Sequence, residues 1–207
     1  MDTDGHGQTR TDMVDVVAFS QRDARWADER LGTGELSIGQ AGCLLAAVAG
    51  MLASWGVSTD PHRLNEFVLH SYGFMDGNLF VFASVDGLGC RFVEFVECER
   101  RPAPIARLAG ALNEGCGVAA CVDATPGGAL EQHWVRILNL TERSGWIVDP
   151  WQAPGDEKID LSKYLTAGWD PARGIFAAAI YRRLDARRAR AWRSAAEMWQ
   201  PRVCVRS

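Results

Sequence analysis

The stretch "SIGQAGCLLAAVAGML" at residues 37–52 decides how the chain folds, because a long apolar run follows directly on a glycine and a cysteine. Over 42–55 nearly every residue is apolar or small, and the first polar side chain of the run is that of Ser54. This pattern is typical of a helix buried on most of its sides. We therefore expect a central helix over 42–55 with Cys43 at its beginning.

Length and composition favour an ordinary globular domain. The chain has 207 residues, of which 47% are hydrophobic and 23% charged, and these values suit a single domain with a real core. Its net charge of −4 does not favour a nucleic-acid partner, and the basic stretch at 182–193 is interpreted as a solvated helix face. No run of 18 apolar residues indicates a membrane span. The N-terminus lacks the pattern of a signal peptide, so we expect a cytoplasmic protein, with release by cell lysis left open.

Helices precede strands along the chain. Polar residues 1–13 are expected to form a disordered tail, 14–184 a single domain, and 185–207 a C-terminal extension with a helix over 184–200. Helices are also predicted at 59–73 (with Asp60 as its N-cap), 77–89 and 103–117, and strands at 117–124, 133–141, 145–151 and 174–184. Residues 14–19 are expected to form either a short strand or an extended entry to the domain. The strands over 133–141 and 145–151 are expected to form a hairpin. This order indicates an α+β fold with a mostly antiparallel sheet.

Cysteine spacing points away from metal and disulfide chemistry. The six cysteines lie at positions 43, 90, 98, 116, 121 and 204, without a C-x-x-C pair or a Cys/His cluster of zinc spacing. Most are expected to be small core residues, above all Cys116 and Cys121, which belong to an apolar strand-like run. No metal or other cofactor is predicted.

Cys43 differs from the other thiols in its expected position. The start of a helix favours a thiolate, because free N–H groups and the helix dipole stabilise negative charge there. Gly42 in front of it is expected to allow close approach of a substrate. A nucleophilic thiol also needs a base from elsewhere in the fold.

His133 is the histidine best placed to be that base. It begins the strand "HWVRILNL" after a flexible segment, whereas His62 and His70 lie on a predicted surface helix. Asp149 is the candidate to orient the imidazole, since it ends the neighbouring strand 16 residues later. A core cysteine, a strand-edge histidine and a turn aspartate are the plain interpretation of each residue alone. Their joint arrangement favours catalysis.

These residues also carry a resemblance to a known family. The segments "FSQRDARWADERLG", "SIGQAGCLLAAVAGMLASWGVSTDPHRLNEFV", "HWVRIL" and "GWIVDPW" resemble the papain-like cysteine peptidases that include the bacteriocin-leader peptidases. The chain is more closely similar to the bacterial and phage peptidase C39-like domains, over about residues 17–184. The resemblance implies a papain-like fold, in which a central helix carrying the nucleophile packs on an antiparallel sheet that carries the histidine and the aspartate.

The resemblance also implies roles for single residues. Cys43 would be the nucleophile, His133 the general base and acid, and Asp149 the orienting group. A glutamine would complete the oxyanion hole with the backbone N–H of Cys43. Gln21 matches the glutamine segment of the family and is preferred to Gln40, which lies only three residues before the cysteine.

Trp134 and Trp151 flank the histidine and the aspartate in sequence, and both are candidates to line the cleft, together with Gln40 and Gly42. Core packing is the alternative for the two tryptophans. The expected function is hydrolysis of an amide bond in a peptide or protein. Acyl transfer by the same triad, and a non-catalytic binding or structural module on the same fold, are the alternatives.

Overall fold

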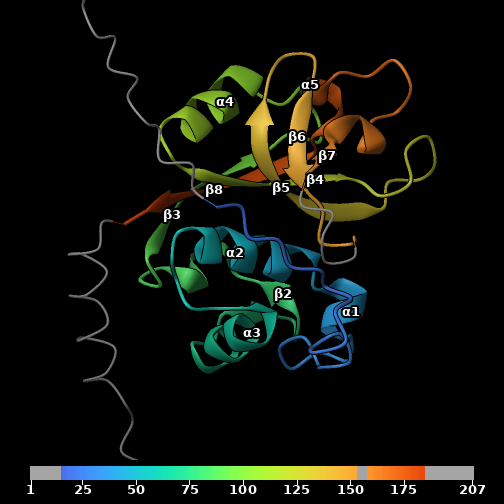
Figure 1. Cartoon of the computed structure of the whole chain (residues 1–207). Helices are drawn as coiled ribbons and strands as arrows, with labels where there is room; N and C mark the ends of the chain where they lie inside the picture. The colour runs from blue at the N-terminus through green and yellow to red at the C-terminus, as the bar shows by residue number, and fades with distance from the viewer. Residues whose placement is uncertain (1–14, 153–157, 185–207) are drawn as a thin grey trace, which may run out of the picture.

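The fold is an antiparallel sheet with helices on both faces. The computed structural model describes residues 15–152 and 158–184. Six strands form the main sheet in the order β3-β8-β4-β5-β6-β7, and every neighbouring pair is antiparallel. Helices α2 and α3 lie on one face of this sheet and α4 lies on the other (Figure 1). The predicted α+β class with an antiparallel sheet is confirmed.

Helix α2, Cys43–Ser54, occupies the centre of the first layer. Its residues 44–52 are all buried, because helix α3 covers one side and strands β4 and β5 cover another. Met51 is fully buried in a cluster that also contains Leu64 of α3 and Ala119 of β4. The all-round apolar sequence therefore has the packing that it predicts, and the helix is held rigidly along its whole length.

The other helices of this layer begin where capping residues stand. Helix α3, Pro61–His70, starts after Asp60, whose side chain accepts a hydrogen bond from Arg63 N, as predicted. A short helix α1, Ile38–Ala41, precedes α2 and is separated from it by Gly42. The small sheet of β1, Phe74–Met75, and β2, Leu79–Phe80, follows α3, and the 3-10 turn η1, Phe82–Val85, comes next.

The main sheet and the layer on its far side come from the part of the chain that follows η1. The strands are β3 (Cys90–Glu97), β4 (Gly117–Asp123), β5 (Gln132–Leu140), β6 (Gly145–Val148), β7 (Ile159–Asp160) and β8 (Ala177–Arg183). Helix α4, Ile105–Asn113, packs Leu108 against β4 and β5. The 3-10 turn η2, Leu161–Tyr164, and the short helix α5, Pro171–Gly174, complete this layer. The predicted hairpin is confirmed as β5 and β6.

The structure differs from the expected secondary structure at three places. The expected helix over 77–89 is absent, since residues 77, 87 and 89 are glycines at positive φ that break the chain into β2 and η1. Of the two alternatives for 14–19, the strand is absent over the described residues, which run beside α2 without joining a sheet. Strand β3 is missing from the prediction altogether.

Two further expectations fall on residues outside the description. The disordered tail over 1–13 and the helical extension over 185–207 both lie there. Among the described residues, no helix combines the length and the hydropathy that crossing a membrane requires. The cysteines of the described core agree with expectation, since Cys116 and Cys121 are buried.

Candidate active site

The site lies where the N-terminus of α2 meets one end of strand β5. Cys43 is the first residue of α2, and its side chain is partly exposed, whereas the other described cysteines are buried. The N–H groups of the first helical turn have no acceptor within the helix, so they are free to stabilise negative charge beside the sulfur. His133 is the second residue of β5 and is 5% exposed.

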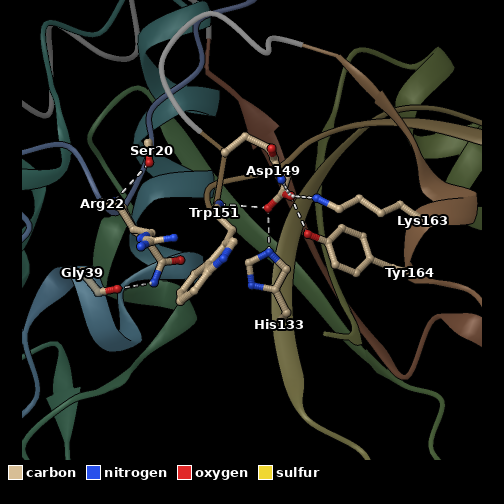
Figure 2. Close-up of polar contacts among 10 residues, drawn as sticks. Ser20, Arg22, Gly39, His133, Asp149, Trp151, Lys163 and Tyr164 are labelled. Carbon is tan, nitrogen blue, oxygen red and sulfur yellow. Dashed lines mark hydrogen bonds and ion pairs between the residues drawn. The ribbon is translucent and has the colours of Figure 1, made fainter. Parts of the chain in front are cut away.

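His133 and Asp149 are in direct contact. Asp149 follows the end of β6, and its Oδ1 lies 2.7 Å from His133 Nε2 (Figure 2). Strands β5 and β6 are neighbours, and this pairing brings together two residues that are 16 positions apart. Because Nε2 faces the carboxylate, Nδ1 is the ring nitrogen left for the thiol.

Asp149 accepts more hydrogen bonds than the one from histidine. Oδ1 also accepts from Trp151 N at 2.9 Å. Oδ2 accepts from Gln152 Nε2 at 2.9 Å, from Lys163 Nζ at 3.1 Å and from the hydroxyl of Tyr164. A buried carboxylate is costly unless its lone pairs are filled, and these donors fill them.

These contacts set the charges of the pair. Burial alone would lower the pKa of His133, but hydrogen bonds with Asp149 and Cys43 outweigh it and raise the pKa to about 9. Burial alone would raise the pKa of Asp149, but its hydrogen bonds, first of all that with His133, hold it well below the ordinary range. Asp149 is therefore ionised at neutral pH, and His133 carries a proton under the same conditions.

Aromatic rings surround the imidazole. The ring of Tyr164 lies 5.3 Å from that of His133, and the ring of Trp151 lies 6.4 Å from it with its plane nearly perpendicular. Arg22 stacks over the outer side of Trp151 at 4.7 Å. These rings keep water from much of the His133–Asp149 contact, which strengthens the electrostatic interaction between the two side chains.

The two candidate glutamines have different surroundings. Gln21 is 1% exposed; its backbone N–H donates to Pro150 O at 2.7 Å and its Nε2 donates to Gly39 O at 3.0 Å. An amide nitrogen carries two hydrogens, so one remains for another acceptor. Gln40 is exposed, and its Oε1 accepts from Ser37 N in the capping box of α1. Its side chain therefore already has a structural partner.

Most of the predicted site residues line one pocket. It has a volume of about 530 Å³, and its walls include Gln21, Gln40, Cys43, His133, Trp134 and Trp151. Lys163, Tyr164 and Glu131 also line it. Within residues 15–152 and 158–184, no group of three His, Cys, Asp or Glu side chains is arranged to hold a metal ion.

Gly42 is placed differently from the expectation. It is buried, and a Cβ added to it would lie 2.5 Å from Ile38 O and 2.7 Å from Ile38 Cγ2. The glycine is needed because the turn between α1 and α2 is tightly packed, and it is not among the residues that line the pocket. Close packing within the chain, rather than approach of a substrate, accounts for this position.

Three side chains of the site were not foreseen from the sequence. Gln152, Lys163 and Tyr164 all donate to Asp149 Oδ2. Lys163 and Tyr164 belong to η2, a single turn at the end of a region with no apolar periodicity of its own. Only the fold brings that turn beside Asp149, so no spacing rule could have found it.

Comparison with known proteins adds a distant similarity. No family model matches the chain, and no curated protein sequence matches it. A solved structure of a proposed C39-like peptidase from Bacillus anthracis is similar to it, with 16% sequence identity and a TM-score of 0.47 over 83% of this chain and 96% of that chain. At this level of similarity an activity does not transfer, so the functional assignment depends on the side chains of the pocket.

Proposed function

We propose that the chain is a cysteine peptidase that hydrolyses amide bonds with Cys43, His133, Asp149 and Gln21. The observation that carries this proposal is the buried contact between His133 and Asp149 in a pocket that Cys43 also lines. A thiol at a helix start, a histidine beside it and an orienting carboxylate together form the arrangement that thiol nucleophiles require.

The first half of the reaction acylates the enzyme. The proton of the Cys43 thiol passes to His133 Nδ1 before the substrate binds, which gives a thiolate beside a protonated histidine, and the thiolate then attacks the carbonyl carbon of the substrate. The carbonyl oxygen becomes an oxyanion, which the backbone N–H of Cys43 and the second Nε2 hydrogen of Gln21 stabilise. The tetrahedral intermediate collapses as the C–N bond breaks, and the leaving amine takes the proton from His133. A thioester on Cys43 remains.

The second half releases the acid. A water molecule gives a proton to His133 and attacks the thioester carbonyl, forming a second oxyanion at the same site. Collapse breaks the C–S bond, the acid product departs, and the Cys43 thiolate beside protonated His133 is restored. Asp149 stays ionised throughout, because its role is to orient the ring and to stabilise the imidazolium that forms in each half.

Cleavage of a peptide library tests this function. The wild-type chain and the Cys43→Ala variant are incubated with a mixed-sequence library, and new amino termini are identified by mass spectrometry. We expect cleavage by the wild-type chain at a restricted set of sequences and none by Cys43→Ala. Cleavage by both proteins at equal rates, or by neither, contradicts the proposal. Adding a labelled primary amine separates hydrolysis from acyl transfer, since incorporation of the amine in preference to water would replace the peptidase assignment.

A further inference from the structure

Turn η2 contributes two of the donors that hold Asp149. Both act on Oδ2, where the ammonium of Lys163 lies at 3.1 Å and the hydroxyl of Tyr164 also donates. Oδ1 faces His133 instead. The carboxylate is therefore shared between two directions, with the histidine on one side and the turn on the other (Figure 2).

The two donors differ in burial and in charge. Tyr164 is 4% exposed, and burial together with Asp149 raises the pKa of its hydroxyl far above the ordinary value, so it remains a neutral donor at neutral pH. The side chain of Lys163 is 46% exposed and lies at the rim of the pocket. One donor is thus a fixed neutral dipole, and the other is a cation that solvent partly screens.

We propose that Tyr164 and Lys163 are positioning residues of the reaction, which draw the charge of Asp149 toward Oδ2 and so limit how tightly Asp149 holds the proton of His133. The reason is that a carboxylate engaged by other donors is a weaker acceptor for each one. The histidine must both take a proton from Cys43 and give one to the leaving amine. A carboxylate without these competitors would hold the imidazolium too strongly for the second step.

The sign of the effect separates this role from plain packing. Removing a donor from Oδ2 leaves more negative charge for His133, so its pKa rises, whereas removing Asp149 itself lowers that pKa. A Tyr164→Phe substitution keeps the ring that packs against His133, so a purely structural role leaves the pKa unchanged. Other ionisable groups near the pair are Cys43 on α2, Glu131 just before β5 and Arg22 beside Trp151, and substitutions of Tyr164 and Lys163 change none of them.

The inference rests on the proposed function, because it concerns the same His133–Asp149 pair, but its test does not depend on peptide cleavage. The pKa of His133 is measured by NMR titration of its ring C–H signals in a Cys43→Ala background, where the thiol cannot contribute. Tyr164→Phe is expected to raise this pKa by roughly one unit. Lys163→Met is expected to raise it by roughly half a unit, because its ammonium is partly exposed.

Two matched controls accompany these variants. Tyr181→Phe removes the hydroxyl of another buried tyrosine, one that has no hydrogen-bond partner among the described residues and does not touch Asp149. Lys158→Met removes an exposed lysine outside the pocket. Neither control is expected to shift the titration of His133.

The titration tests the positioning role of Tyr164 and Lys163, and peptide cleavage tests the proposed function, so the two can fail separately. Upward shifts in both η2 variants support the inference, even if the wild-type chain cleaves no peptide, in which case the proposed function alone fails. An unchanged or lowered pKa in Lys163→Met, whose partly exposed side chain makes misfolding unexpected, overturns the inference even if peptides are cleaved. The same result in a folded Tyr164→Phe variant also overturns it.

Discussion

Replacement of Asp149 by asparagine removes the charge that stabilises protonated His133 while keeping the shape of the side chain. The Asp149 carboxylate accepts hydrogen bonds with both of its oxygens, whereas the asparagine amide has only one acceptor oxygen. Either His133 or Tyr164 therefore loses its acceptor in Asp149→Asn. An opposite charge in direct contact shifts a pKa by about 1–3 units. The pKa of His133, now about 9, is therefore expected to fall by about 1–3 units, which corresponds to about 1.4–4 kcal/mol.

The rate of Cys43 alkylation by iodoacetamide reports this change. Under the proposed function we expect protonated His133 to stabilise a thiolate on Cys43 in the wild-type chain, so that alkylation is fast at neutral pH. In Asp149→Asn the rate at pH 7 is expected to fall roughly tenfold or more, in line with the lost pKa shift. Asp123→Asn is the matched control, since Asp123 is also buried but binds the backbone N–H groups of Thr125 and Glu131. An unchanged rate and an unchanged His133 titration in Asp149→Asn would refute the reasoning.

Three further predictions concern stability and the oxyanion site. The pKa of His133 is raised in the folded state to about 9 from 6.5, so protonated His133 stabilises the fold by on the order of 3 kcal/mol. This contribution is complete below pH 6.5 and disappears as the pH rises through 9. Urea unfolding of the wild type and of His133→Ala across this pH range measures it, and parallel curves of stability against pH would contradict it. Gln21→Ala is expected to lower kcat by about 10²–10³-fold with little effect on Cys43 alkylation. Gln40→Ala is expected to leave kcat nearly unchanged and to cost about 0.5–1.5 kcal/mol of stability, because the hydrogen bond from Ser37 N in the capping box is lost. Equal kcat losses in steady-state assays would overturn this distinction. Gly42→Ala is expected to destabilise the fold by about 1–3 kcal/mol, because the added Cβ would lie 2.5 Å from Ile38 O; a thermal melt identical to that of wild type would argue against the close packing.

The parts of the fold that local patterns govern could be predicted from the sequence. The all-apolar run of α2 admits only a buried helix, and the Asp60-Pro61 pair marks the start of α3 by capping chemistry. The same reasoning fails over 77–89, where large apolar residues suggest a helix but glycines at positive φ prevent one. Strand β3 was missed because its edge position leaves alternate residues exposed and weakens the apolar signal.

The residues of the candidate site also fall into some that the sequence indicates and some that only the fold brings together. Cys43, His133 and Asp149 could be named because each stands at the end of a regular element whose pairing is readable from the sequence. Lys163 and Tyr164 could not be named, because their contacts with Asp149 depend on how η2 folds back against the end of β6. Gln152 lies only three residues after Asp149, but no pattern in the sequence indicates that its side chain turns back to the carboxylate. The expectation that Gly42 allows a substrate to approach is not met, because its contact with Ile38, four residues earlier, belongs to a tight turn between α1 and α2 that the sequence pattern does not indicate.

The central claim is that Cys43 is a nucleophile activated by His133, and competitive labelling of the thiols tests it most directly. A limiting amount of an iodoacetamide probe is added at pH 7 to the native chain, and peptide mapping gives the rate at each cysteine. We predict that Cys43 reacts far faster than any other cysteine, and that His133→Ala removes this advantage without unfolding the chain. Labelling of Cys43 no faster than the other thiols, or equally fast in His133→Ala, would contradict the account.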